Sequence, residues 1–421
     1  SFLVLQTSNE IEHQSNSMRN VFSLVFSFCG LTVFGQHMLP LVQDTTGKYK
    51  GSITLTSNGD YASNAIGKNI VQSFFYGGFI DQNMKNSSIE RLQNINQFGL
   101  DMNAELSFRS KGDLTKKENS TFYNHGYIVQ AGYHQFSSLV FSRDAFRYAF
   151  EGNSLFLGDT ADFSGTRFNS MGYSKFGFGI FNRSTNNSLT LNVISLNQFA
   201  SGNMETASIL QDSQNDTIQM DYTGGFSFAK NGGFSKGFGI SFDVDYRIQT
   251  NENDHAMTFQ LLAKNIGFML PTQMTRYAAD SSFQYTGFNL NQLVQQNLLS
   301  TMSLADTLGI EKGTEKRALL LRGFIQFSKL VDMQATQRIQ SFYGARMFLS
   351  QNYIPYFFAG VHGRVTKHWS TGLSASFGGF SQLKWGMYSS FQLSRWNIGV
   401  ASENLFSKTG ESIILQVKCA F

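Results

Sequence analysis

The chain has 421 residues, of which 15% are charged and 3 are Pro, whereas Phe numbers 42 and Gly 39. An average soluble protein has about 25% charged residues and about 5% Pro. Because Pro cannot donate to a sheet ladder, its scarcity favours one very large sheet. Beyond the N-terminal region no apolar run approaches the roughly 18 residues of a membrane helix, which excludes a helical membrane protein. The net charge of +4 is weak for this length and does not indicate nucleic-acid binding.

The N-terminal region has the pattern of an export signal. Residues 1–17 are polar and do not begin with Met, and we expect them to be upstream translation from a mis-called start. Residues 18–35 read as a signal peptide, with a short basic segment, an apolar stretch and a cleavage site before Gln36. We expect the mature chain, 36–421, to form a single domain.

The main pattern of the mature chain is alternation of apolar and polar residues, which is typical of strands with one apolar face. It is clearest at 98–109, where Phe98 and Leu100 begin the apolar face and Asp101 begins the polar face. Most of these segments have about the 9–11 residues that a membrane strand needs. Fifteen segments show the pattern: 48–57, 98–109, 124–136, 171–181, 188–197, 216–228, 238–248, 256–268, 317–328, 339–350, 355–366, 369–378, 384–393, 395–406 and 413–421.

These segments predict an all-β protein that forms a closed antiparallel transmembrane β-barrel. Bacterial barrels have even strand numbers, so we expect about 14 strands, with about 16 as the alternative. A soluble β-sandwich is the competing fold, but the export signal, the aromatic content and the C-terminus favour the barrel. The chain ends in Phe421 after an alternating apolar segment, which resembles the C-terminal signal read by the barrel assembly machinery. The expected location is therefore the outer membrane, in contact with its lipid.

Three segments place apolar residues at helical spacing instead: Ala65–Phe79, Arg143–Glu151 and Asn289–Leu304. Such short amphipathic helices cap the rim of a barrel, lie on the membrane interface, or enter the lumen as a plug or gate. The candidate gate residues of the third segment are Leu290, Leu293, Val294 and Leu298. The segment Ser201–Asp216 is polar and irregular, and we interpret it as a loop.

The polar faces of the predicted strands carry charges that would point into the lumen. Asp243, Asp245 and Arg247 alternate along one strand, and Arg109 lies on the polar face of another. Carboxylates opposed by arginines are ordinary in the lumen of a porin-like barrel. These four residues are our candidates for the lumen wall.

No catalytic motif stands out. The sequence contains no HExxH, CxxC, GxSxG or phosphate-binding loop. A Ser–His pair of the kind found in outer-membrane phospholipases remains an alternative at His134 or His362. We expect a protein that is not an enzyme and has no metal, cofactor or catalytic residues.

Short motifs give the chain a resemblance to a known group of barrels. Gly152-Asn153, followed by Gly158-Asp159, and the segment Ala263–Phe268 resemble recurrent features of an uncharacterised Bacteroidota outer-membrane family. That family is similar in layout to FadL-type fatty-acid transporters and to the PorV/PorP-type barrels of type IX secretion. The resemblance implies a 14-stranded outer-membrane barrel, and it carries over no catalytic residue.

Two functions follow from this reading. A FadL/PorV-like barrel would pass a small hydrophobic solute across the outer membrane. Gly177, Gly179 and Gly360 are candidate kinks that open a gap in the wall, and close packing of aromatic side chains against these glycines is the alternative explanation. The alternative is a non-transporting partner barrel in a secretion or surface-assembly complex. The expected partners are outer-membrane lipid, the barrel assembly machinery, and either a hydrophobic small molecule or a secretion-system protein, but no nucleic acid.

Overall fold

The computed structural model describes residues 49–110, 124–212, 217–229, 233–252, 255–285, 309–332, 337–349 and 353–421. Three predictions lie outside these residues: the segment 1–17, the signal peptide at 18–35 and the helix at 289–304. Within the described ranges, none of the helices is both long enough and apolar enough to cross a membrane.

Strands dominate the secondary structure, with a few short helices between them. The strands are β1 (Gly51–Ser63), β2 (Ile95–Ser110), β3 (His125–Ser142), β4 (Thr160–Asp162), β5 (Arg167–Asn182), β6 (Ser188–Asp212), β7 (Thr217–Ala229), β8 (Gly237–Glu252), β9 (His255–Pro271), β10 (Met274–Tyr285), β11 (Glu311–Glu315), β12 (Leu319–Leu320), β13 (Phe324–Lys329), β14 (Ile339–Phe348), β15 (Ile354–Arg364), β16 (Trp369–Gly379), β17 (Ser381–Leu393), β18 (Trp396–Ser402) and β19 (Gly410–Ala420). The helices are α2 (Lys68–Tyr76), α3 (Gln82–Ile89), α4 (Arg143–Glu151) and the 3-10 helix η1 (Asn153–Phe156).

A 14-strand antiparallel ring closes on itself, which confirms the predicted barrel. It runs through β1, β2, β3, β5, β6, β8, β9 and β13, and then in sequence order from β14 to β19. β19 pairs with β1, from Ser52 opposite Ala420 to Ala62 opposite Gly410. Closure removes the free edges that an open sheet would expose. The rim with Gly51 and Ala420 is called the terminal end, and the opposite rim, which carries α2 and α4, the helix end.

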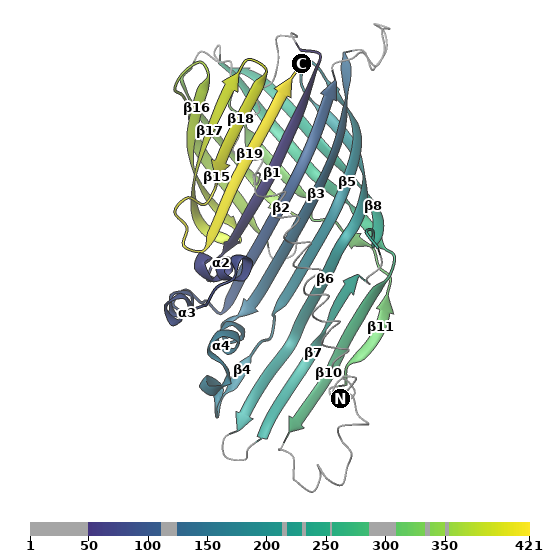
Figure 1. Cartoon of the computed structure of the whole chain (residues 1–421), viewed down its shortest axis with the longest axis vertical. Helices are drawn as coiled ribbons and strands as arrows, with labels where there is room; N and C mark the ends of the chain where they lie inside the picture. Colours follow the sequence, from purple (N-terminus) through teal and green to yellow (C-terminus); the bar gives the residue numbers. More distant parts are fainter. Residues whose placement is uncertain are drawn as a thin grey trace. The chain divides into compact units, whose positions relative to one another are not determined.

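One side of the barrel continues beyond the helix end. β6 is 25 residues long. Its first part pairs with β8, and from Ala200 onward the same edge pairs with β7. β7 pairs with β10, and β10 pairs with β11. Figure 1 shows this extension sheet, which consists of β4, the second part of β6, β7, β10 and β11, below the ring.

The extension explains why the sequence predicted an odd number of strands. The predicted strand 216–228 is β7, which follows β8 along one edge of β6 and therefore takes no place of its own in the ring. The predicted loop at Ser201–Asp216 is wrong, because β6 continues to Asp212. The strand β10 was also missed. The second part of β6 and β10 lie beyond the helix end of the ring. A strand there need not have one apolar face, so the alternation of apolar and polar residues is weaker.

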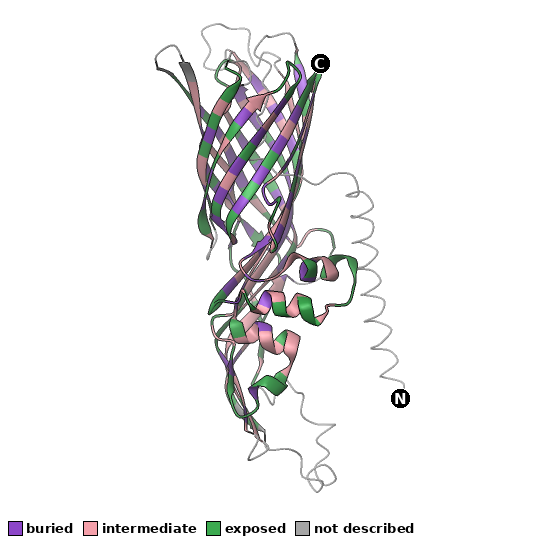
Figure 2. Cartoon of the chain, turned by 90° about the vertical axis from the view of Figure 1, so that its left-hand side faces the viewer, coloured by how far each residue is buried: buried purple, intermediate pink, exposed green. Residues whose placement is uncertain are grey.

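Burial alternates along the ring strands as the sequence pattern predicts. In β17, Leu383, Trp385 and Met387 face outward and are exposed, whereas Lys384 and Tyr388 face the lumen and are buried. Figure 2 shows the same alternation as bands of buried and exposed residues along the strands. An apolar outer face around a polar interior is the arrangement of outer-membrane barrels.

The helices α2, α3 and α4 cover the outer face of β2 and β3 at the helix end. Phe98, Leu139 and Phe141, which face outward from these strands, pack in one apolar cluster with Ile70 of α2 and Phe146 of α4. The helices therefore lie at the rim of the barrel, which is one of the positions predicted for them, and not in its lumen.

Two of these helices were predicted and one was not. α4 coincides with the predicted segment Arg143–Glu151, and α2 lies inside Ala65–Phe79. Ser142 begins α4 as its N-cap, since its Oγ accepts a hydrogen bond from the Ala145 backbone N–H at 3.0 Å. The helix α3 escaped prediction because its residues are mostly polar and form no apolar stripe.

The aromatic packing inside the helix end gives the first prediction. The ring of Phe380 lies against Gly99, so that a Cβ at residue 99 would overlap it, and Phe380 packs with Phe136 and Phe348. We expect Gly99→Val to lower the free energy of unfolding by about 1–3 kcal/mol, measured by urea unfolding of the detergent-solubilised barrel. In the control Gly313→Val, the added Cβ meets nothing within 4 Å, and the change should stay within about 0.5 kcal/mol. Equal losses in both variants would contradict the role of Gly99.

Candidate functional site

The inward face of β5 passes through three layers of the lumen. Arg167 and Asn169 line an open cavity, Met171 and Tyr173 belong to a buried apolar cluster, and Lys175 lies in a network of ion pairs. Residues two apart on a strand face the same side, so these layers follow one another along the lumen. They are called the cavity, the apolar layer and the ionic layer.

The cavity lies on the inner face of the extension sheet and has a volume of about 810 Å³. Two of its carboxylates are held by neighbours: Ser227 Oγ donates to Glu315 Oε2 at 3.1 Å, and Thr223 Oγ1 donates to Asp280 Oδ1 at 2.9 Å. The lining mixes both signs of charge with backbone glycines, so the wall of the cavity is largely polar. Its charged members are Arg167, Arg276, Arg317, Arg322, Glu205, Asp280, Glu311 and Glu315.

The apolar layer begins directly beyond the cavity and is buried throughout. Its members are Met171, Tyr173, Ile194, Leu196, Phe199, Ala229, Met269, Met274, Leu319 and Leu321. On four strands, a residue that lines the cavity and a residue of the apolar layer are neighbours on the same face. These pairs are Asn169 and Met171, Ser201 and Phe199, Ser227 and Ala229, and Arg276 and Met274. A solute in the cavity therefore meets an apolar surface at its inner side.

The wall of the barrel is interrupted at the level of the apolar layer. β6 pairs with β8 up to Ser195 and with β7 from Ala200, and among the described residues no strand pairs with 196–199 on this edge. Between the described residues, the stretch is bridged by a backbone bond from Lys236 N to Leu196 O at 2.7 Å and by a side-chain bond from Asn197 Nδ2 to Phe234 O at 3.1 Å. β9 also ends here at Pro271, before β10 starts. The ladder is thus weakest beside the apolar layer.

The glycines predicted to open the wall do not do so. Gly177, Gly179 and Gly360 each pair regularly with strands on both sides, so the predicted gap at these positions is wrong. At Gly177 a Cβ would overlap the side-chain oxygen of Asn192. The glycine makes room for a lumen side chain rather than for a kink.

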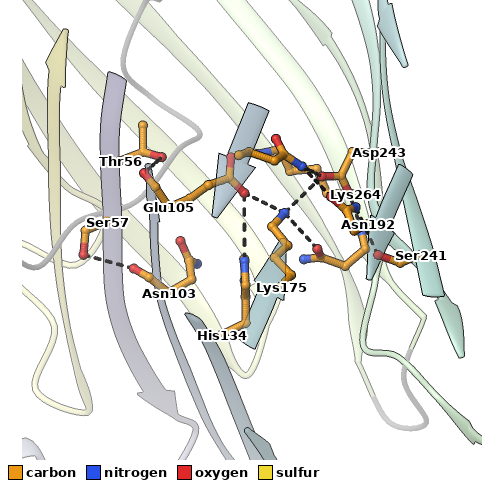
Figure 3. Close-up of polar contacts among 12 residues, drawn as sticks. Thr56, Ser57, Asn103, Glu105, His134, Lys175, Asn192, Ser241, Asp243 and Lys264 are labelled. Carbon is orange, nitrogen blue, oxygen red and sulfur yellow. Dashed lines mark hydrogen bonds and ion pairs between the residues drawn. The ribbon is translucent and has the colours of Figure 1, made fainter. Parts of the chain in front are cut away.

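The ionic layer is centred on Lys175, whose side chain is fully buried (Figure 3). Its ammonium has three N–H donors and lies close to three oxygens from three strands: Glu105 Oε2 at 2.6 Å, Asp243 Oδ2 at 3.0 Å and Asn265 Oδ1 at 3.1 Å. Lys264 Nζ contacts the other oxygen of Glu105 at 3.0 Å. Each buried charge therefore has a partner of opposite sign, as burial requires.

Neutral side chains complete the ionic layer. Gln130 Nε2 donates to Asp243 Oδ2 at 2.6 Å and to Asn192 Oδ1 at 2.8 Å, and Asn192 Nδ2 donates to Ser241 Oγ at 3.1 Å. In Figure 3, Glu105 lies on one side of Lys175 and Asp243 and Asn192 lie on the other. The network thus occupies the part of the lumen that β2, β3, β5, β6, β8 and β9 line.

A β-bulge in β9 places two consecutive side chains in this layer. The pairing of β8 with β9 slips between Phe242 and Val244, so that Lys264 and Asn265 both lie opposite Asp243. Asn265 adopts φ 55°, a left-handed conformation that Asn tolerates. Its backbone N–H donates to Asp243 Oδ1 at 2.7 Å. This bulge lies in the segment 263–268 that carried the family resemblance, and it gives the segment a structural role.

The four charged residues predicted for the lumen wall all face the lumen but divide into two groups. Asp243 belongs to the ionic layer, where it pairs with Lys175 and not with an arginine. Nearer the terminal end, Arg247 forms a two-pronged contact with Asp245 at 3.0 and 2.7 Å. The guanidinium of Arg109 lies 5.6 Å from the ring centre of Phe181.

Two lysines that dominate the ionic layer were missed. Phe176 and Phe178 lie on the apolar, outward face of their strand, so Lys175, which precedes Phe176, must lie on the opposite, inward face. Lys264 gave no such signal, because the bulge breaks the alternation. The remaining predicted gate residues, Leu290, Leu293, Val294 and Leu298, lie outside the described residues.

The predicted assembly residue Phe421 closes the terminal end. Its ring stacks on Phe108 with centres 6.1 Å apart. Its backbone N–H donates to Gly51 O at 3.0 Å, and its carbonyl oxygen accepts from Gly51 N at 2.9 Å. Phe421 thus joins the two ends of the ring, while its recognition by an assembly machinery stays a prediction.

The two histidines considered for catalysis take part in packing. The ring of His134 stacks on Tyr173 with centres 5.3 Å apart, and His362 Nδ1 is hydrogen-bonded to Tyr388 Oη. Among the described side chains, no group of three His, Cys, Asp or Glu residues is placed to hold a metal ion.

A polar and aromatic cluster fills the opposite side of the lumen at the helix end. Lys384 Nζ lies 3.8 Å from Asp60 Oδ2, and Tyr356 Oη donates to Glu403 Oε2 at 3.0 Å. Glu403 follows β18 and is buried, and this burial raises the pKa of its carboxyl, while the charge of Arg346 opposes the rise. The space left here is about 30 Å³, enough for about one water molecule.

Comparison with known proteins finds structural likeness without sequence likeness. No protein-family model and no curated protein matches the sequence. The chain is similar to the toluene transporter TbuX of Ralstonia pickettii, with a TM-score of 0.41 and 8% identity over 90% of this chain and 91% of that one. For the toluene transporter TodX of Pseudomonas putida the values are 0.37 and 7%, over 92% and 93%. For the translocator domain of the autotransporter NalP from Neisseria meningitidis they are 0.26 and 8%, over 98% of each chain.

The ionic layer gives the second prediction. Lys175→Met leaves the buried carboxylates of Glu105 and Asp243 without their shared cation, and we expect it to lower the free energy of unfolding by about 3–5 kcal/mol. The matched control is Lys367→Met in the exposed turn after β15, with a change within about 0.5 kcal/mol. Adding Glu105→Gln and Asp243→Asn to Lys175→Met should recover part of the loss. If urea unfolding shows equal effects at residues 175 and 367, the ionic layer does not hold the barrel together.

The bulge gives the third prediction. A left-handed backbone costs a residue with a Cβ about 1–2 kcal/mol, whereas Gly adopts it freely. We therefore expect Asn265→Ala to be less stable than Asn265→Gly in urea unfolding by about 1 kcal/mol. At Ser241, which lies in an extended strand, the order should reverse, because Gly weakens strands. The same order at both positions would show that the bulge does not constrain residue 265.

Proposed function

We propose that this protein is an outer-membrane β-barrel, not an enzyme, that passes small, mainly apolar solutes, with its helix end facing the outside. The apolar outer face supports a membrane location. The connections support the orientation. The longest connection between ring strands at the terminal end is 111–124, between β2 and β3. At the helix end the connections β1–β2, β3–β5, β6–β8 and β9–β13 are longer than this and include α2–α4 and the extension sheet. In bacterial barrels the short turns face the periplasm and the long connections face outside.

The observation that carries the proposal is the contact between the cavity and the apolar layer. The cavity volume of about 810 Å³ lies within the range of about 300–1,000 Å³ that small-molecule sites occupy. A solute that enters from outside meets polar groups first and then the buried side chains of Met171 and Met274. Its apolar part gains by leaving water for this layer, at roughly 25 cal/mol per Å² of apolar surface.

The exit is lateral, through the interrupted wall. In this route the ionic layer is the barrier to a straight path, since its paired buried charges lie in the lumen between β2, β5, β8 and β9. Beside the apolar layer, residues 196–199 are bridged to the described residues before β8 by the Lys236–Leu196 backbone bond and the Asn197–Phe234 side-chain bond. Opening this stretch exposes the apolar layer to the membrane and lets the solute pass into lipid.

Filling the cavity tests this route and gives the fourth prediction. Ala278 lines the cavity from β10, and Ala278→Trp places an indole in the space a solute needs. In cells that carry the protein, we expect radiolabelled naphthalene to enter faster than in cells without it. Ala278→Trp should reduce this excess rate about ten-fold, which corresponds to about 1.4 kcal/mol.

The control carries the same substitution on the other face of the wall. Ala131→Trp lies on the exposed outer side of β3 and should leave the naphthalene rate unchanged. A large ion conductance in planar bilayers, without solute preference, would contradict the closed ionic layer. If the wild-type barrel does not accelerate uptake, the alternative function remains: a partner barrel in a Bacteroidota secretion complex of the type IX kind, detected by co-purification with a secretion component.

A further inference from the structure

Exposed apolar side chains, most of them aromatic, lie on α2, on the segment that follows it and on the neighbouring loop between β18 and β19. Phe74 is 70% exposed, Phe79 is 86% exposed and Phe406 is 81% exposed, and Phe75 and Leu405 are also exposed. These five residues are called the aromatic patch. Single exposed apolar residues are normal, but grouped ones mark a contact surface.

The patch is held firmly against the rim. The Lys68 backbone N–H donates to Lys408 O at 2.8 Å, and Gln72 Nε2 donates to Glu411 Oε1 at 2.7 Å. Ile70 and Val71 of the same helix are buried. The aromatic side chains are therefore exposed on a fixed scaffold that joins α2 to the start of β19, and their exposure is not the result of a frayed helix.

The patch is continuous with the outer face of the ring. The Leu405 backbone N–H donates to Trp385 O at 3.0 Å. Trp385 itself faces outward from β17 and is 54% exposed, between the exposed side chains of Leu383 and Met387. The apolar outer face of the ring thus continues into the loop that carries Phe406.

We propose that the aromatic patch inserts into the outer leaflet at the boundary between headgroups and acyl chains. Aromatic side chains gather at this depth in barrels and in interfacial helices. Lipid is the occupant that the structure favours, because the patch continues the apolar outer face of a barrel that the proposed function places in a membrane. The side chains α2 contributes to it are apolar, and none of its residues is acidic. The patch would fix the height of the helix end in the membrane.

Lipid-based quenching tests the proposal in the full chain. Both native cysteines, Cys29 and Cys419, are replaced by Ser, and a single Cys is introduced as Phe79→Cys or Phe406→Cys and labelled with the fluorophore NBD. Each variant is placed in phosphatidylcholine vesicles with a spin label near the top of the acyl chain. We expect the fluorescence at both positions to fall about two-fold, since interfacial side chains lie roughly 5–10 Å into the boundary.

The control is Asn153→Cys in η1, an exposed polar position beyond α4, where the spin-labelled lipid should cause no loss. Folding of each variant is checked by gel mobility with and without heating. The two reporters lie on different segments, so failure of one variant to fold leaves the other as a test. Quenching at 79 and 406 no greater than at 153 overturns the proposal. Cross-linking of two copies at these positions without lipid quenching overturns it as well, since a second copy would then be the occupant.

Discussion

One buried ammonium sets the register of this barrel. Lys175 of β5 reaches acceptors on β2, β8 and β9, and its side chain is fully buried. Breaking a buried ion pair by removing one partner typically costs about 3–5 kcal/mol. A one-residue slip of a strand would turn its lumen residues toward the membrane. The contacts of Lys175 therefore restrict β2, β5, β8 and β9 to a single register. The same contacts place paired charges in the part of the lumen that these strands line.

The two sides of the barrel differ in length. The strands β14 to β19 end at the helix end, whereas β6 continues into the extension sheet (Figure 1). The cavity is therefore walled on one side, by the extension, and opens outside the ring. Its inner side is the apolar layer. A solute would be gathered outside the barrel proper and brought to the place where the wall is least bonded.

Sequence reasoning found the ring strands and one strand of the extension sheet, β7, but neither the rest of the extension nor the contacts inside the lumen. A membrane wall demands one apolar face from each strand, so alternation located the ring strands. It could not locate β10 or the second part of β6, because these strands lie outside the membrane wall and need not have one apolar face. Parity placed Asp243 in the lumen, but its partner Lys175 is 68 residues away in sequence, and strand register alone brings them together. At Lys264 and Asn265 parity itself fails, because a bulge turns both side chains inward.

The energies of the two possible exits differ in kind. Passing straight through requires separating Lys175 from Glu105 and Asp243, and each buried charge left alone costs several kcal/mol. An apolar solute cannot replace those partners, since it offers neither charge nor hydrogen bonds. In the proposed route, passing sideways from the apolar layer exchanges apolar contacts for lipid contacts, which are nearly equal in free energy, and disturbs the Lys236–Leu196 and Asn197–Phe234 bonds. A net hydrogen bond is worth about 0.5–1.5 kcal/mol, so for an apolar molecule this proposed path has the lower barrier of the two.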